Sequence, residues 1–236
     1  MNPIYHFSDD RATPEQALAA FRNQADMWMN LPGASCALWW NHTPPYPDGP
    51  VGCIGAWQAQ DRDQAAVLLE AAVATLRQHG VSVVVGPMDG NTWRKHRLVV
   101  DSDGRPPFFM EPTHAPAWVE DFESAGFQRM AEYTSAAVDL TRADPDLSGF
   151  TRKLEGRGIR LCPIDMTRFD ATLHDIHRLS LEAFAGNFLY TPLTWENFRA
   201  MYDGMRDRIV PDLVRLAWDT DGLAAFLFGF PDLLDS

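Results

Sequence analysis

The chain has 236 residues, of which 46% are hydrophobic and 22% charged, a composition typical of a globular protein of one or two domains. Its formal net charge of -12 argues against nucleic acid and anionic membrane surfaces as partners, since both require a basic face. There is no apolar run of membrane-spanning length and no signal-peptide pattern at the N-terminus, so a cytoplasmic location is expected.

The first 60 residues predict one helix and two strands. Thr13-Pro14-Glu15 is typical of a helix start, and the apolar spacing after it predicts a helix to about Asn30. Two strands follow, Ser35–Asn41 and Val51–Gln58, which we expect to pair as an antiparallel hairpin. Glycines at 52 and 55 suggest a bulge in the second strand or a close approach of another backbone to it.

The next stretch predicts a β-α-β unit. Asp61–His79 has an apolar helical stripe, an aspartate at its start and Gly80 at its end. The β-branched run Val81–Val85 follows at once and predicts a buried strand. The strands on either side of the helix should therefore be parallel neighbours.

Residues 97–140 predict irregular and edge structure. We expect a short strand at Arg97–Asp101, a rigid proline-flanked segment at 106–112, a helix at Ala115–Ala125 and a long strand at Phe127–Leu140.

The last third of the chain begins after a turn-rich linker at 141–156. It predicts a strand, two helices and a hairpin of two strands, at 158–164, 169–185, 194–205, 213–218 and 223–230. The last apolar strand would lie on an unprotected sheet edge, so we expect that it joins the first sheet or that the chain is the front part of a longer protein. Two domains are predicted, residues 1–142 and residues 157–236.

The loop after Val85 is the most distinctive polar feature. Gly86-Pro87 ends the strand, a turn at Asp89-Gly90-Asn91 follows, and then come Trp93 and the densest cationic cluster of the chain, residues 94–97. Polar and aromatic groups past the end of a buried strand are typical of a ligand site. The alternative is a solvated basic loop.

The order of elements resembles the GNAT superfamily of acyl-CoA N-acyltransferases. Residues 158–230 resemble the opening half of that fold and residues 35–140 its closing half. The segments GPMDGNTWRKHRLVV, PPFFMEP, AGF and AEYTSA resemble bacterial tandem GNAT-like proteins in particular. The resemblance implies an α/β (α+β) fold with a mixed central sheet flanked by helices, followed by a second, partial half, and an opening between two splayed strands beside the 61–79 helix.

The resemblance also implies a function and site residues. An acyl group, acetyl being the simplest, would pass from acyl-CoA to a small-molecule amine, with no metal and with a homodimer as a possible assembly. Glu111 would act as the base and Tyr190 would protonate the departing thiolate. The acceptor side would be lined by Asn91, Trp93, Arg94, Arg97, Phe108, Asn187 and Phe188.

One departure from the family pattern concerns the cofactor. GNAT members hold the CoA pyrophosphate on main-chain N–H groups of a glycine-rich loop at a helix start. The corresponding stretch here, residues 58–64, has no glycine and places Asp61 and Asp63 where phosphate charges would sit, with Arg62 between them. No cofactor-binding residue is therefore assigned.

Other readings of these residues stay open at the sequence level. The alternative for Glu111 is an ion pair with Arg94 or Arg97, and the alternative for Tyr133 and Tyr190 is a place in the core or at its rim. His174 and His177 have i, i+3 spacing but lack a third ligand, and the three scattered cysteines have no metal-ligand spacing. Two functions follow, a GNAT-like N-acyltransferase and a degenerate GNAT-like module that binds a ligand or partner without turnover.

Overall fold

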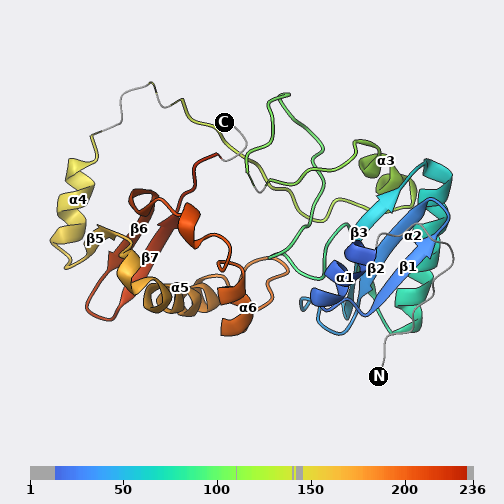
Figure 1. Cartoon of the computed structure of the whole chain (residues 1–236), viewed down its shortest axis with the longest axis horizontal. Helices are drawn as coiled ribbons and strands as arrows, with labels where there is room; N and C mark the ends of the chain where they lie inside the picture. Colours follow the sequence, from blue (N-terminus) through green and yellow to red (C-terminus); the bar gives the residue numbers. More distant parts are fainter. Residues whose placement is uncertain (1–13, 110, 140, 142–145, 233–236) are drawn as a thin grey trace. The chain divides into compact units, whose positions relative to one another are not determined.

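The computed structural model describes residues 14–109, 111–139, 141 and 146–232. The chain forms two compact units: unit 1 is Met1–Met130 with Asn187–Thr191, and unit 2 is Ala131–Gly186 with Pro192–Ser236. The protein is a mixed α/β protein with two sheets flanked by helices, as predicted at that level (Figure 1). The break between the units falls at residues 130 and 131, whereas the sequence placed it in the 141–156 stretch.

Unit 1 contains a four-stranded mixed sheet of order β1-β2-β3-β4. The strands are β1 (Met27–Leu31), β2 (Ala34–Trp39), β3 (Val51–Ala59) and β4 (Val83–Val85). The first three are antiparallel, and β4 is parallel to β3 through the crossover helix α2 (Arg62–Gln78). The predicted hairpin and β-α-β unit are confirmed, but the strand predicted as buried at Val81–Val85 is limited to Val83–Val85, whose residues are half-buried.

One face of this sheet packs against α2. Alternate residues of β2, among them Cys36 and Leu38, meet the buried stripe of α2, which includes Leu68 and Leu69. Helix α3 (Ala117–Ser124) adds Phe122 to the same core. Burying one such side chain contributes about 1.5–3 kcal/mol, so this layer supplies a large share of the stability of unit 1.

The opposite face of the sheet is covered by irregular segments and by α1 (Pro14–Arg22). Trp39 and Cys53 point to this side and are fully buried with Met88. Leu189 completes the same cluster. It lies in Asn187–Thr191, the short later segment of the chain that belongs to unit 1.

Unit 2 contains a three-stranded antiparallel sheet of order β5-β6-β7. The strands are β5 (Arg160–Pro163), β6 (Val214–Trp218) and β7 (Leu223–Phe228), and the helices are α4 (Ser148–Glu155), α5 (Phe169–Ala183) and α6 (Trp195–Ala200). Three single 3-10 turns lie at Met166–Arg168, Arg206–Arg208 and Pro211–Leu213. Because β7 pairs with β6 in this separate sheet, the expectation that it might join the first sheet is wrong.

The predicted helix to Asn30 is wrong in its second half. Helix α1 ends at Arg22, Gln24 takes a left-handed φ of 63°, and Met27–Leu31 form strand β1 against β2. No glycine or proline marks this break, and the pairing with β2 is not a local property of the segment. Thr13, the predicted cap, lies outside the described residues.

Two predicted strands and the end of one helix are also wrong. Residues 97–101 and 127–139 have no strand assignment, and Val138 in the second stretch is 80% exposed. An extended sequence with no neighbouring strand has no ladder to join, whatever its own pattern. The helix predicted at 194–205 stops at Ala200 and continues as turns. Leu140, the predicted strand end, lies outside the described residues.

Among the residues that the structure describes, no helix combines the length and apolar character needed to cross a membrane.

Candidate functional site

A bulge in β3 is the starting point of the site. Ser35 lies opposite Gln58 and Ala37 opposite Gly55, so β3 carries one extra residue between them, at Ala56 with φ 44°. The bulge turns the Ala56 N–H out of the strand ladder and toward the Asp89 carboxylate, which accepts it at 2.7 Å. The bulge hinted at by the glycines is thus confirmed.

Gly55 is required by this arrangement. A Cβ on residue 55 would lie 2.4 Å from Asp89 Oδ1 and 2.5 Å from the Met88 carbonyl oxygen. The Asp89 carboxylate therefore occupies the space that any other residue at position 55 would fill.

Burial raises the pKa of the Asp89 carboxyl above its ordinary value, while the Ala56 N–H bond and the nearby charges of Lys95 and Arg94 act in the opposite direction. Cys53 lies close to it, with its thiol 3.6 Å from the Gly90 carbonyl oxygen. Burial, with Asp89 as a smaller cause, raises the pKa of this thiol, so it is not a candidate nucleophile.

Residues 88–97, called the 88–97 loop, close on themselves. Met88 and His96 form an isolated bridge, and the Asp89 N–H donates to the Lys95 carbonyl oxygen at 2.8 Å. The Arg97 N–H donates to the Pro87 carbonyl oxygen at 3.1 Å, with Arg97 at φ 66°. The loop is a compact, internally bonded element rather than a solvated tail.

Arg94, predicted to bind the acceptor, is directed into unit 1. Its guanidinium donates to the carbonyl oxygen of Asn23, which also accepts the indole N–H of Trp39 at 2.9 Å. Burial lowers the pKa of the Arg94 guanidinium. The side chain thus ties the loop to the turn between α1 and β1.

Segment 187–191 lies against the 88–97 loop. The side chain of Leu189 is buried at 6% exposure among Trp39 and Met88. The indole of Trp93 donates to the Thr191 carbonyl oxygen at 2.8 Å, and the Thr92 hydroxyl lies 3.5 Å from the Leu189 carbonyl oxygen.

Aromatic rings flank the buried leucine on both sides. Phe188 meets Tyr46 edge to face at 6.2 Å between ring centroids, and Tyr190 meets Trp93 at 6.1 Å. Burial raises the pKa of the Tyr190 phenol, which keeps it protonated at neutral pH.

The structure thus brings several predicted site residues together in unit 1. Asn91 is buried and its side-chain oxygen accepts the Trp93 N–H at 3.0 Å, which orients the indole toward segment 187–191. Asn187 starts the turn of that segment by accepting the Tyr190 N–H at 3.2 Å.

Phe108 and Glu111 form a turn of their own. The Glu111 carboxylate accepts the Phe108 N–H at 3.0 Å, and the Glu111 N–H returns a bond to the Phe108 carbonyl oxygen at 2.9 Å. The carboxylate proposed as a base is therefore used in part for local turn structure. Met110 lies outside the described residues.

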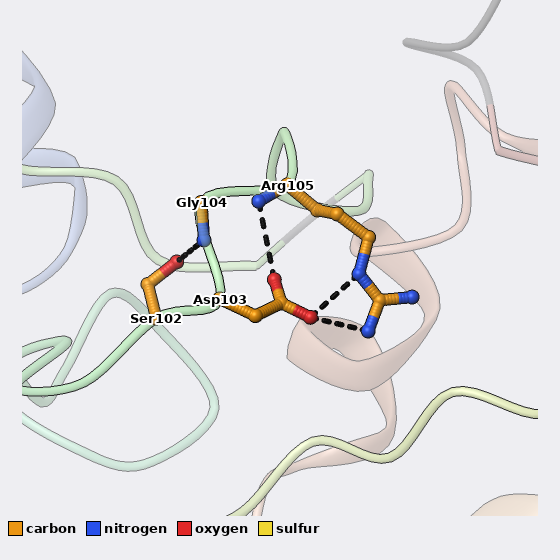
Figure 2. A network of polar contacts seen from close by, with 4 residues as sticks. All are labelled: Ser102, Asp103, Gly104 and Arg105. Carbon is orange, nitrogen blue, oxygen red and sulfur yellow. Dashed lines mark hydrogen bonds and ion pairs between the residues drawn. The ribbon is translucent and has the colours of Figure 1, made fainter.

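The exposed turn at residues 102–105, which precedes Phe108, also forms its hydrogen bonds within itself (Figure 2). Asp103 accepts the N–H of Arg105 at 3.1 Å and its Nε–H at 2.6 Å and pairs with its guanidinium, while Ser102 accepts the Gly104 N–H at 3.2 Å. These bonds with Arg105 lower the pKa of the fully exposed Asp103 carboxyl.

The position expected for a CoA pyrophosphate is filled by the chain itself. The Asp61 carboxylate caps α2 by accepting the Gln64 N–H at 2.9 Å, and the Gln60 N–H donates to the Gly33 carbonyl oxygen at 2.9 Å. Arg62 donates to the Ser124 hydroxyl on α3. A phosphate here would compete with Asp61 for the helix end.

The pairing of β3 with β4 covers only the start of β3. The two strands pair from Val51 and Val83 to Cys53 and Val85. Beyond them the Met88 N–H donates to the Ile54 carbonyl oxygen at 2.8 Å. Backbone contact with β3 therefore continues up to the bulge, and beyond it no β4 residue pairs with Trp57–Ala59 of β3 in the part of the chain that the structure describes.

Unit 2 contains a shallow hollow of about 150 Å³ between α5 and the turns after α6. It is lined by Phe169, Asp170, Leu173, Arg199, Tyr202, Asp203 and Arg206. Nearby, buried His177 bonds the Leu193 carbonyl oxygen at 2.9 Å. Among the described residues there is no cluster of three or more His, Cys, Asp or Glu side chains suited to a metal ion.

Two residues that shape the site were not singled out from the sequence. The sequence signals for Asp89 are a glycine next to a suspected bulge and an aspartate past the neighbouring strand. The signal for Leu189 is an apolar residue between two aromatics, which indicates docking on another segment.

No family model matches this chain, and no solved structure matches it. Protein YghO of Escherichia coli (strain K12) is 24% identical over 187 residues, which are 78% of this chain and 47% of that protein. The chain thus spans about half the length of this relative.

Proposed function

We propose that this chain is a GNAT-like module whose first unit binds a ligand or partner without carrying a CoA pyrophosphate site of its own. The order of strands and helices in each unit supports the relation to the GNAT fold. The GNAT assignment rests on this order and on the sequence resemblance.

One observation carries the proposal. The α2 start, where the resemblance places the CoA pyrophosphate, and the β3 bulge, which lies at the expected divergence of β3 and β4, are bonded to the chain's own carboxylates, Asp61 and Asp89. Carboxylate–amide bonds are charge-assisted and local, so a phosphate or an acyl oxygen would have to displace them and meet two negative charges.

The surface around the 88–97 loop supports ligand binding instead. It gathers the rings of Tyr46 and Trp93 with the hydroxyl of Thr92 in one region of unit 1, where segment 187–191 lies. Aromatic rings with polar tips are typical of recognition surfaces.

Calorimetric titration of the whole chain with acetyl-CoA tests the proposal. We expect no saturable heat and no thermal stabilisation at millimolar acetyl-CoA. Binding with micromolar affinity would contradict it, because a ligand present at 100 times its Kd stabilises a protein by about 2.7 kcal/mol.

A second candidate, acyl transfer to an amine, is favoured by one observation. Tyr190 lies beside Trp93 of the 88–97 loop, with 6.1 Å between ring centroids, and its phenol carries the proton that a departing thiolate would need. Release of free CoA from acetyl-CoA in the presence of a panel of amines, lost in Tyr190→Phe, would establish it. If no free CoA is released, the result supports the binding module instead.

A further inference from the structure

Segment 187–191 is held on unit 1 in the manner of a bound peptide. Its central side chain, Leu189, is buried in the cluster of Trp39 and Met88, while the neighbours Phe188 and Tyr190 turn their rings to Tyr46 and Trp93. One buried apolar anchor between two aromatic contacts is the pattern of an anchor residue in a pocket with a surrounding rim.

The main chain of the segment is recognised as well. Its carbonyl oxygens at Leu189 and Thr191 face two donors from consecutive residues of the 88–97 loop, the hydroxyl of Thr92 and the indole of Trp93. Main-chain carbonyls are common to every peptide, so these contacts provide affinity that does not depend on the identity of the ligand's side chains.

The conformation of the segment is imposed by the surface on which it lies. Leu189 has a φ of 50°, a left-handed conformation that a leucine rarely adopts and that persists when surrounding contacts hold it. The hydroxyl of Thr191 is buried with no hydrogen-bond partner, so this position of the segment is not optimised for its site.

We infer that unit 1 is a peptide-binding module, and that segment 187–191 is its ligand within this chain. The ligand class is a short peptide with leucine between two aromatic residues. Thr92 and Trp93 bind its carbonyl oxygens at the leucine and two residues later. This deepens the proposed function by naming the ligand. The test of the inference involves no CoA, so the inference and the proposed function can each fail without the other.

Fluorescence anisotropy with a labelled, capped peptide of sequence NFLYT tests the inference. In the full-length Leu189→Asp variant the anchor is removed from the intrachain segment, and we expect saturable binding of the added peptide. In the wild-type chain the intrachain segment competes at a millimolar effective concentration, so binding should be at least ~10-fold weaker.

Two controls distinguish specific recognition of the leucine from non-specific binding of the peptide. A peptide of sequence NFDYT, which lacks the anchor, should not bind the Leu189→Asp variant. The double variant Leu189→Asp with Trp93→Phe keeps an aromatic ring but loses the indole donor, and should bind NFLYT several-fold more weakly. Equal binding of both peptides, or no gain over the wild type in a folded variant, would overturn the inference.

A measurement on the wild-type chain avoids dependence on the folding of any variant. Excess NFLYT should displace the intrachain segment, and hydrogen exchange of the amides at 188–191 should accelerate while that of α2 stays unchanged. Unchanged exchange at 188–191 with millimolar peptide would count against peptide recognition.

Discussion

The sheets of the two units are covered in different ways. In unit 1 all six residues of β2 are buried, because α2 covers one face and α1, the 88–97 loop and Leu189 cover the other. In unit 2 three of the four residues of β5 are exposed, and Leu227 of β7 is 65% exposed. A sheet buried on both faces fixes its register strongly, so unit 1 offers the more rigid base for a binding surface.

The largest difference between the two sheets is expected from truncation of one leucine in each. Leu38→Ala in β2 empties a fully buried site and should cost about 2–5 kcal/mol, whereas Leu227→Ala in β7 should cost about 0.5 kcal/mol or less. Urea denaturation followed by circular dichroism measures both. Equal losses would contradict the contrast between the sheets.

Gly55→Ala tests the fit of Asp89 to the bulge. The added methyl would collide with the Asp89 carboxylate and the Met88 carbonyl, and should cost about 1–3 kcal/mol. Gly149→Ala in α4 is the matched control, since its Cβ meets no atom within 4 Å and alanine favours a helix. A neutral Gly55→Ala would show that the carboxylate does not hold this position.

The cap of α2 should contribute about 1 kcal/mol. Asp61→Ala removes the acceptor of the Gln64 N–H, whereas Asp63→Ala removes the same charge from the first turn without removing the cap. The difference between the two variants in thermal unfolding isolates the cap. If both lose the same stability, the charge alone matters and the position would be open to an anion.

The smallest effect is a dependence on pH. Burial raises the pKa of Asp89 in the folded protein, so the native state holds this proton more tightly than the unfolded chain does. Stability should therefore fall as pH rises from about 4 through the folded pKa. Asp89→Asn keeps an acceptor for the Ala56 N–H but has no proton to lose.

The stability of Asp89→Asn relative to the wild type should accordingly rise between pH 4 and pH 7 in urea titrations. The exposed Asp48→Asn is the charge-matched control. A relative stability of Asp89→Asn that falls over this range would mean that the carboxylate is stabilised by its surroundings more than burial penalises it.

The parts of the fold that were predicted correctly are set by local signals. Asp61 and Gly80 mark both ends of α2, and the turn at 219–222 places β6 and β7 side by side. The wrong predictions concern pairing with distant residues. Met27–Leu31 has an apolar pattern that suits a helix, and it becomes a strand because β2 is available to pair with it.

Only part of the site was predicted, because the rest of it depends on contacts between residues that are far apart in the sequence. The residues of the 88–97 loop were identified because they follow the β-branched run that forms β4. That Trp93 meets Tyr190 depends on how a segment nearly a hundred residues later folds back, which no local pattern encodes. The bond between Asp89 and Ala56 likewise joins the 88–97 loop to the middle of β3, and the parallel pairing of β3 with β4 brings the two together.

The central claim is that Asp61 and Asp89 occupy the backbone positions where a GNAT-like cofactor would bind. Hydrogen exchange of the amides at 54–65, recorded with and without millimolar acetyl-CoA, tests it most directly. The account predicts identical exchange in both samples, since the N–H groups of Ala56 and Gln64 are already bonded to the two carboxylates. Slower exchange confined to 54–65 on addition of acetyl-CoA would contradict it.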